Sequence, residues 1–254
     1  MNLDRIIAVR NTKTLYRDGS RCIKVFSSSY TDSDVIGEAF NQASALSAGL
    51  NVPKLYEVSE NNGRWTMISE FIKGKTLAEL IAEFPEKLDE YLAVFIEVQN
   101  TINNSTCPPL RSIADVLSSG IEKCDLTALD KFVLRSQLQL LPCGNKFLHG
   151  DLEPSNIIIG RNGTPYILDW SQAAQGDISA DIAISYVSFM ADNEAELAKM
   201  YLEKARSVAG TDIDTVMQWL PAVAAAMSVN SFGSKREYLL KYADNAINRK
   251  GDNK

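Results

Sequence analysis

The chain has 254 residues, of which 45% are hydrophobic and 23% charged, a composition typical of a globular protein rather than a fibrous or disordered one. Its formal net charge of −6 disfavours nucleic acid or an anionic membrane as the main partner, because both would repel the average surface. Four scattered cysteines and a single histidine argue against a Cys/His zinc site, and unpaired thiols without an apolar leader segment predict a cytoplasmic protein.

The N-terminal part of the chain carries mostly strand signals. Residues 5–9 and 21–26 are short and apolar-rich, and polar turn residues bound both segments. Residues 33–48 instead place apolar side chains three and four positions apart, which predicts a helix. Asp32 or Ser33 is the expected N-cap of this helix, because both residue types can accept a hydrogen bond from the first turn.

Two further strands are expected at residues 54–58 and 64–71. A Lys-Gly-Lys tripeptide at 73–75 then breaks the strand pattern. We therefore expect two parts, a β-rich lobe over 1–72 and a mainly helical lobe over 73–254.

Beyond this boundary the apolar spacing is mainly helical. A short strand-rich insert at residues 147–170 interrupts the helices. The expected fold class is α+β, with a small antiparallel β-sheet lobe that carries one helix and a larger, mainly helical lobe. The helices of the second lobe are expected near residues 76–84, 88–102, 126–140, 194–208, 213–229 and 235–247.

The insert contains the residues that are most informative about chemistry. It reads FLHGDLEPSNIII and, after a turn, YILDW. Phosphoryl transfer requires a group that accepts the proton of the attacking hydroxyl and oxygen ligands that hold Mg²⁺ on the phosphates. Asp151 suits the first task, and Asn156 and Asp169 offer the sparse oxygen ligation that Mg²⁺ prefers.

The pattern H-G-D-x-x-x-x-N, followed by a hydrophobic strand, a turn and I-L-D-W, resembles the catalytic and metal motifs of the aminoglycoside phosphotransferase / choline kinase family. That resemblance implies a bilobal, protein-kinase-like fold. It also implies a small-molecule kinase that transfers the γ-phosphate of ATP or GTP to a substrate hydroxyl. Asp151 would be the catalytic base, and Asn156 and Asp169 would hold Mg²⁺.

The resemblance assigns nucleotide-binding residues to the first lobe as well. Lys24, in the strand CIKVF, would contact the α- and β-phosphates, and Glu38 on the following helix would hold this lysine. The segment MISEFIKG resembles the interlobe hinge of the family. The carbonyl of Glu70 and the amide of Ile72 would therefore face the adenine edge.

Two departures from kinase patterns shape the expected activity. The first two strands lack G-x-G-x-x-G between them, and the corresponding loop is residues 10–14. This loop could meet the phosphates through backbone amides, through hydroxyls such as that of Thr12, or through Lys13. Glu153 stands where protein kinases carry a lysine, and no D-F-G or A-P-E motif follows, which disfavours a protein kinase. Glu153 and Asp177 are candidate contacts for the acceptor, a small hydroxylated molecule that could carry a positive charge.

A nucleotide-binding pseudokinase or sensor without turnover is the alternative interpretation. A degenerate site of that kind should have lost at least one of the residues assigned above, and this chain retains them all. His149 and Asp181 are expected to be structural, the first as a buried residue and the second as an anchor early in a helix.

Overall fold

The computed structural model describes residues 5–10, 13–61 and 63–248. The chain forms two compact units. The first unit lies within Met1–Phe95 and Pro154–Gln172, and the second within Ile96–Glu153 and Ala173–Lys254. These units are defined by packing, and the functional division at residue 72 stays a prediction.

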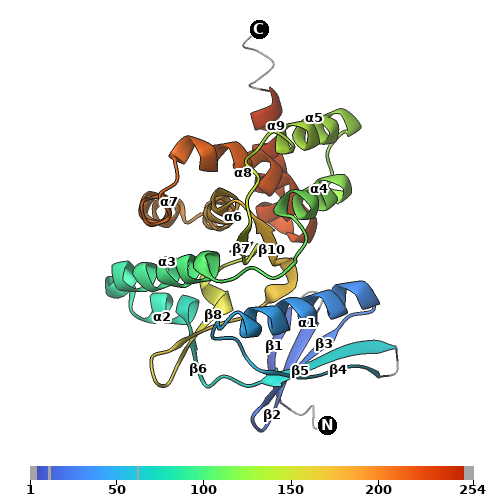
Figure 1. Ribbon diagram of the computed structural model, residues 1–254, viewed down its shortest axis with the longest axis vertical. Coiled ribbons are helices and arrows are strands. Elements are labelled where there is room, and N and C mark those ends of the chain that lie inside the picture. The colour runs from blue at the N-terminus through green and yellow to red at the C-terminus, as the bar shows by residue number, and fades with distance from the viewer. Residues whose placement is uncertain (1–4, 11–12, 62, 249–254) are drawn as a thin grey trace. The chain divides into compact units, whose positions relative to one another are not determined.

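A five-stranded antiparallel sheet in the order β1-β2-β3-β5-β4 forms the base of the first unit (Figure 1). The turn between β2 and β3 contains Gly19 at φ 59°, a left-handed conformation that suits a tight hairpin. The sheet confirms the predicted N-terminal antiparallel strands. Its strands are β1 (Ile6–Arg10), β2 (Lys13–Asp18), β3 (Arg21–Phe26), β4 (Leu55–Asn61) and β5 (Arg64–Glu70).

Helix α1 (Asp32–Ser47) packs on this sheet. Its N-cap is Thr31, so the prediction of Asp32 or Ser33 was wrong. Thr31 is the N-cap because it completes a capping box. Its hydroxyl accepts a hydrogen bond from the N–H of Asp34, and the carboxylate of Asp34 accepts one from the N–H of Thr31.

The hydrophobic contact between α1 and the sheet is small and well buried. Val35 and Ala39 of α1 pack with Phe26 of β3 and Met67 of β5. Val35 and Ala39 are four residues apart, so they share one helix face. The other faces of α1 are therefore available for polar residues.

A second, three-stranded sheet in the order β6-β8-β9 completes the first unit, with α2 (Leu77–Glu83) packed against it. Its strands are β6 (Gly74–Thr76), β8 (Ile157–Gly160) and β9 (Pro165–Ile167). The strand β6 was not predicted, because the Lys-Gly-Lys sequence at 73–75 resembles a boundary between lobes. A Cβ atom at Gly74 would lie 2.1 Å from the carbonyl oxygen of Ile159, so the close pairing with β8 requires glycine there.

The second unit is mainly helical, and α6 lies at its centre. Residues on nearly every face of α6 are buried, and α7, α8 and α9 pack against it. A two-stranded sheet of β7 (Lys146–Leu148) and β10 (Ala174–Gly176) accompanies the helices. These helices are α4 (Ile113–Lys123), α5 (Ala128–Leu138), α6 (Ile178–Ala191), α7 (Ala195–Ala209), α8 (Ile213–Met227) and α9 (Gly233–Asn248), and α3 (Leu88–Asn104) begins in the first unit and ends in the second.

Helix α4 was not predicted, although its signals are present in the sequence. Ser112 caps it, and Ile113, Leu117 and Ile121 form a buried stripe with a spacing of four residues. Gly120, which weakens a helix prediction, is required because a Cβ atom there would lie 2.7 Å from the Cβ atom of Ala226. Tertiary packing therefore determines that this segment forms a helix.

Among the helices of the described residues, none is both long enough and apolar enough to cross a membrane.

Candidate functional site

The carboxylate of Asp169 lies at the centre of a charged cluster in the first unit. The ammonium of Lys13 donates to both of its oxygens, at 2.8 and 2.7 Å. The ammonium of Lys24 lies 3.7 Å from Oδ1 of Asp169 and donates a hydrogen bond to Glu38. Each of these four side chains is at most 12% exposed. Two cations and two anions thus neutralise one another in a nearly dry environment.

Lys24 is held in its charged form by this cluster. Burial alone would lower the pKa of Lys24, but the charges of Asp169 and Glu38 more than offset it, so the pKa lies above its usual value. The predicted contact between Lys24 and Glu38 is therefore present. A permanently charged lysine is the form needed to contact phosphates.

Asp169 has an unusual backbone conformation. Its φ is 62°, in the left-handed region that few residues other than glycine adopt, although Asp and Asn tolerate it best. Residues held in such conformations carry strain that the surrounding structure must offset. Here the strain directs a carboxylate into the cluster.

Asn156 lies beside Asp169 at the open end of the β8–β9 hairpin. The N–H of Leu168 donates to the carbonyl of Asn156 at 2.8 Å, and the next pair, Ile157 and Ile167, continues the ladder. The structure therefore places the backbones of Asn156 and Asp169 at the same end of this hairpin, and their binding of a metal stays a prediction. In the described part of the chain, no three His, Cys, Asp or Glu side chains form a metal cluster. Mg²⁺ here would draw its remaining ligands from water and phosphates.

These residues fit a divalent cation. Amide and carboxylate oxygens are hard ligands of the kind that Mg²⁺ prefers. The carboxylate of Asp169 already holds a positive group, the ammonium of Lys13, in the place where a metal ion would bind. This ammonium is a stand-in for the cation.

Sequence reasoning missed Asn41 of α1. Its side-chain amide donates to the carbonyl of Trp170 at 2.9 Å, and Trp170 is fully buried. Asn41 lies three residues after Glu38, so both project from one helix face. That spacing was the available signal. Through these two side chains, α1 holds both Lys24 and the residue that follows Asp169.

The predicted adenine contacts lie at the end of β5. The N–H of Glu70 donates to the carbonyl of Lys54 at 2.9 Å, while Ile72 is buried. The contacts of the Glu70 carbonyl and the Ile72 amide with adenine stay predictions. Thr12 lies outside the described residues.

Asp151 belongs to the second unit, in the turn that follows β7. The residue before it, Gly150, has φ 76°, a conformation that favours glycine. Helix α6 holds this turn at two points. Asp181 accepts from the N–H of Gly150 at 2.9 Å, and the hydroxyl of Ser185 donates to the carbonyl of Leu152 at 2.9 Å. The backbone on both sides of Asp151 is thereby fixed.

Asp181 is the structural anchor that its position predicts. It is fully buried and also accepts from the N–H of His149 at 3.4 Å and from the side chain of Asn103 at 3.2 Å. His149 is likewise fully buried. Neither residue is exposed to a ligand.

Replacing Asp181 with alanine should lower the free energy of unfolding by about 3 kcal/mol, because each buried donor left without a partner costs about 1–3 kcal/mol. Asp214→Ala is the matched control, since this exposed carboxylate also lies in the first turn of a helix. It should cost less than about 1 kcal/mol. Urea denaturation measures both variants, and equal losses would remove the anchoring role of Asp181.

Glu153 is engaged by groups from two helices. The hydroxyl of Ser188 donates to its Oε1 at 2.5 Å, and the ammonium of Lys235 lies 3.7 Å from the same oxygen and 2.9 Å from Asp192. Burial would lower the pKa of Lys235, but Asp192, Glu153 and Asp151 outweigh it and raise the pKa. Lys235 therefore shares the electrostatic environment of Asp151.

Asp177 is the N-cap of α6. Its carboxylate accepts from the N–H of Ser179 at 2.9 Å. This bond explains the residue without a ligand, and its contact with an acceptor stays a prediction.

Comparisons with known proteins identify the family of this chain. The family model described as "Phosphotransferase enzyme family" matches residues 17–219. A comparison of the sequence with curated proteins gave no match.

Several solved structures have the same fold. The apo form of a thermostable mutant of aminoglycoside phosphotransferase APH(4)-Ia is 16% identical, with a TM-score of 0.71 over 98% of this chain and 94% of that one. A ternary complex of another such mutant with AMP-PNP and hygromycin B has a TM-score of 0.68 at 16% identity, over 98% of this chain and 94% of that one. Choline kinase LicA from Streptococcus pneumoniae has a TM-score of 0.65 at 14% identity, over 97% of this chain and 95% of that one.

These neighbours confirm the predicted α+β, kinase-like fold. The family model covers most of the chain, from β2 to α8. This chain belongs to the phosphotransferase enzyme family.

Proposed function

We propose that the protein is a small-molecule kinase that transfers the γ-phosphate of ATP or GTP to a substrate hydroxyl. The observation that carries this proposal is the dry cluster of two lysines around Asp169, beside Asn156. Membership of the phosphotransferase family and the AMP-PNP bound in a structural neighbour support it. Nucleotide donors and unpaired thiols also fit a cytoplasmic setting.

Each residue has a defined task in this proposal. Lys24, oriented by Glu38, contacts the α- and β-phosphates, and Asn156 and Asp169 would hold Mg²⁺, which neutralises phosphate charge when bound. Asp151 accepts the proton of the substrate hydroxyl as its oxygen attacks the γ-phosphorus. The bond between that phosphorus and the β,γ-bridging oxygen breaks, and the nucleoside diphosphate leaves.

Lys13 has a second task in the empty protein. It occupies both oxygens of Asp169, so a metal ion must displace it. Once displaced, its ammonium lies on the strand next to that of Lys24 and is able to meet the phosphates. Lys13 thereby takes the place of the missing glycine-rich loop.

The variant Lys13→Met should bind Mn²⁺ several-fold more tightly without nucleotide, because the competing ammonium is gone. Its affinity for ATP should fall about tenfold, since one charge-assisted contact with phosphate is worth about 1.5–3 kcal/mol. Calorimetric titrations measure both constants. Lys87→Met is the control, because it removes an exposed lysine from the same unit. Unchanged Mn²⁺ affinity in Lys13→Met would contradict the displacement.

The acceptor side of the site is mixed in charge. Lys235 and Ser188 already contact Glu153, so a cationic substrate would have to compete with Lys235 for this carboxylate. We therefore propose that the acceptor is a small hydroxylated molecule and that its charge is matched by Glu153 and Lys235 together.

Mass spectrometry of products tests the proposed activity. The protein is incubated with Mg²⁺, ATP or GTP, and pooled aminoglycosides, choline, ethanolamine, sugars and amino alcohols. A gain of one phosphate on an acceptor, absent with Asp151→Asn, would establish the reaction. Nucleotide binding that depends on Mg²⁺ but yields no phosphorylated product would favour the sensor interpretation, and a lack of nucleotide binding would refute both.

A further inference from the structure

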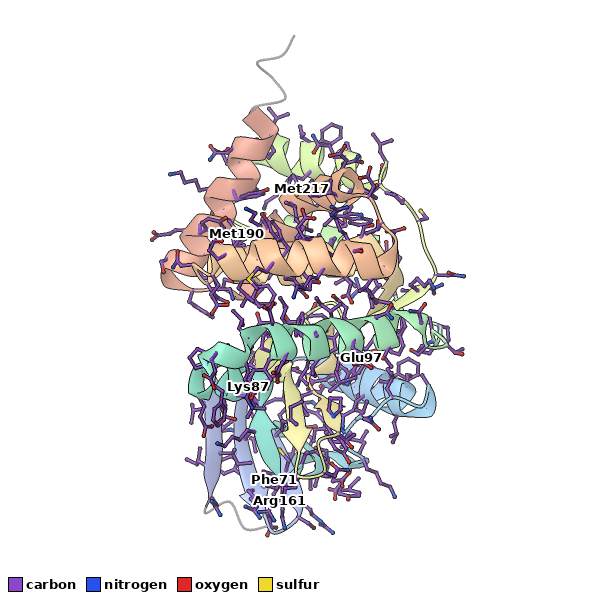
Figure 2. The ribbon with its side chains drawn as sticks, turned by 90° about the vertical axis from the view of Figure 1, so that its left-hand side faces the viewer. Phe71, Lys87, Glu97, Arg161, Met190 and Met217 are labelled. Atoms are coloured by element: carbon purple, nitrogen blue, oxygen red, sulfur yellow. The ribbon has the colours of Figure 1, made fainter. Side chains whose placement is uncertain are left out.

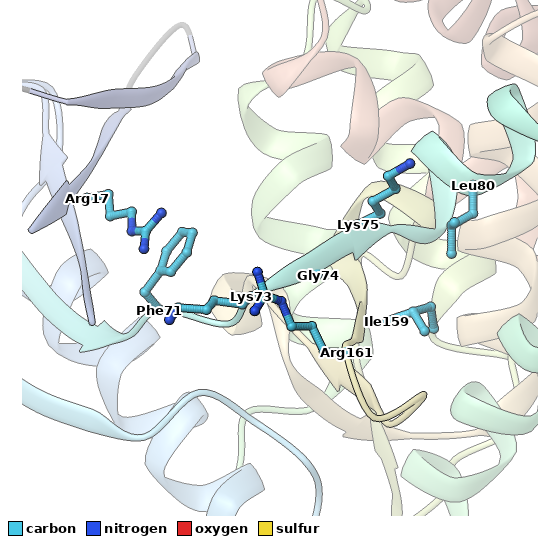
Figure 3. Close-up of a pocket in the computed structure, with 8 residues that line it drawn as sticks. All are labelled: Arg17, Phe71, Lys73, Gly74, Lys75, Leu80, Ile159 and Arg161. Carbon is cyan, nitrogen blue, oxygen red and sulfur yellow. The ribbon is translucent and has the colours of Figure 1, made fainter. Parts of the chain in front are cut away.

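The first unit contains a pocket of about 580 Å³ that four cationic residues line (Figure 3). Arg17 comes from β2, Lys73 and Lys75 from the segment after β5, and Arg161 from the turn after β8. The lining within the described part of the chain contains no acidic residue. Its volume is within the range of small-molecule sites.

The positive charge of this pocket is mostly uncompensated. Among its four cations, only Lys75 forms an ion pair within the described residues, with Glu83, and both side chains are about half exposed, at 54% and 44%. The chain as a whole carries a net charge of −6. Three cations that line one pocket without an ion-pair partner among the described residues therefore stand out from the average surface, and an anion would relieve their repulsion.

Arg17 is held in an orientation suited to an anion. Its guanidinium carbon lies 4.3 Å from the centroid of the Phe71 ring, and its Nε donates to the carbonyl of Gly19 at 3.0 Å. These two contacts leave the terminal nitrogens available. A guanidinium fixed in this way is suited to bidentate hydrogen bonds with a phosphate or carboxylate.

The segments that form the pocket are distant in the sequence. Phe71 and Arg161 lie at the same end of the first unit (Figure 2), and both line the pocket. Ile159 of β8 adds an apolar wall. The pocket is therefore built by the first sheet, the segment after β5 and the β8–β9 hairpin together.

This pocket is separate from the charged cluster around Asp169. None of the residues of that cluster lines it. Arg17 lies four residues beyond Lys13 on β2, a distance of about 13 Å along a strand. Phe71 and Lys73 face the pocket, whereas Ile72 between them is buried.

We infer that this pocket binds a small polyanion, a metabolite with two or more phosphate or carboxylate groups, and that its occupancy changes the affinity for the adenine base. Phe71 links the two sites because it lines the pocket and lies between Glu70 and Ile72, the proposed adenine contacts, in the sequence. This second part rests on the proposed function. By linkage, nucleotide binding must change the affinity for the polyanion by the same factor.

Calorimetric titration with inorganic pyrophosphate, without Mg²⁺, tests the binding. The triple variant Arg17→Gln, Lys73→Gln, Arg161→Gln should bind at least tenfold more weakly than the original protein. A control with Lys123→Gln, Lys199→Gln and Lys241→Gln removes three exposed charges from the second unit and should bind normally. Lys13→Met reports on the nucleotide site instead, because Lys13 does not line the pocket.

Equal losses of pyrophosphate affinity in the two triple variants would show that net charge alone explains the effect. This result would overturn the site. A loss in Lys13→Met with normal binding by the pocket variant would place pyrophosphate in the nucleotide site and overturn it as well. Adenosine, which has no phosphates, tests the coupling: saturating pyrophosphate should change its Kd in the original protein but not in the pocket variant. An unchanged Kd would refute the coupling, and neither readout depends on turnover.

Discussion

Asp151→Asn should lower kcat by about a thousand-fold and leave the Kd for the nucleotide nearly unchanged. A general base of this kind contributes about a hundred- to ten-thousand-fold to rate, and an amide cannot accept the proton of the attacking hydroxyl. The substitution preserves the shape of the side chain. Because Asp181 and Ser185 hold the backbone on either side, the turn itself should keep its conformation.

The matched control for this prediction is Glu153→Gln, which removes a carboxylate two residues away in the same segment. Single-turnover kinetics separate the chemical step from product release, and calorimetry gives the Kd. Glu153→Gln should retain most of kcat, since its carboxylate is bound by Ser188 and Lys235. Unchanged turnover in Asp151→Asn would exclude it as the base, and equal losses in both variants would indicate a general effect of charge.

Most of the fold could be predicted because periodicity reflects local burial. The strands of the first sheet are short apolar-rich segments between polar turns, and α1 repeats apolar residues three and four positions apart, of which Val35 and Ala39 are buried. The strand β6 could not be predicted, since its backbone partner β8 lies far along the chain. Several neighbouring polar residues are able to cap α1. The reciprocal hydrogen bonds between Thr31 and Asp34, which only the structure shows, identify Thr31 as the N-cap.

The candidate site was predicted in its residue types but not in its electrostatics. The resemblance assigns Lys24 and Glu38 to nucleotide binding and Asn156 and Asp169 to the metal, and the structure shows the hydrogen bond between Lys24 and Glu38. The ion pair between Lys13 and Asp169 joins residues 156 positions apart, which no local pattern reveals. Their nucleotide and metal roles stay predictions.

The role of α6 was also beyond local patterns. Asp181, Ser185 and Ser188 lie three or four residues apart on one helix face and bind the backbone or side chains near Asp151. The position of Asp181 predicted a structural role, whereas Ser185 and Ser188 look like ordinary helix residues in the sequence. Their partners become apparent only when the turn after β7 is placed against the helix.

Asp169→Asn should abolish the Mg²⁺-dependent part of nucleotide affinity and lower kcat by more than about a thousand-fold, because the anionic metal ligand is lost. Asparagine tolerates φ 62° nearly as well as aspartate, so the backbone should not change. Without this carboxylate the pKa of Lys24 should fall, since burial is then opposed by Glu38 alone among the carboxylates of the cluster. Nucleotide titrations with and without Mg²⁺ measure the effect.

Glu38→Gln discriminates between a metal ligand and a carboxylate that only balances charge. Both variants remove one negative charge from the same cluster, but Glu38 contacts Lys24 and not the position proposed for the metal. Glu38→Gln should therefore weaken nucleotide binding with and without Mg²⁺ and keep the ratio of the two affinities. If Asp169→Asn preserves that ratio, or if Glu38→Gln abolishes it to the same extent, Asp169 serves only to neutralise the two lysines, and the metal would have to bind elsewhere.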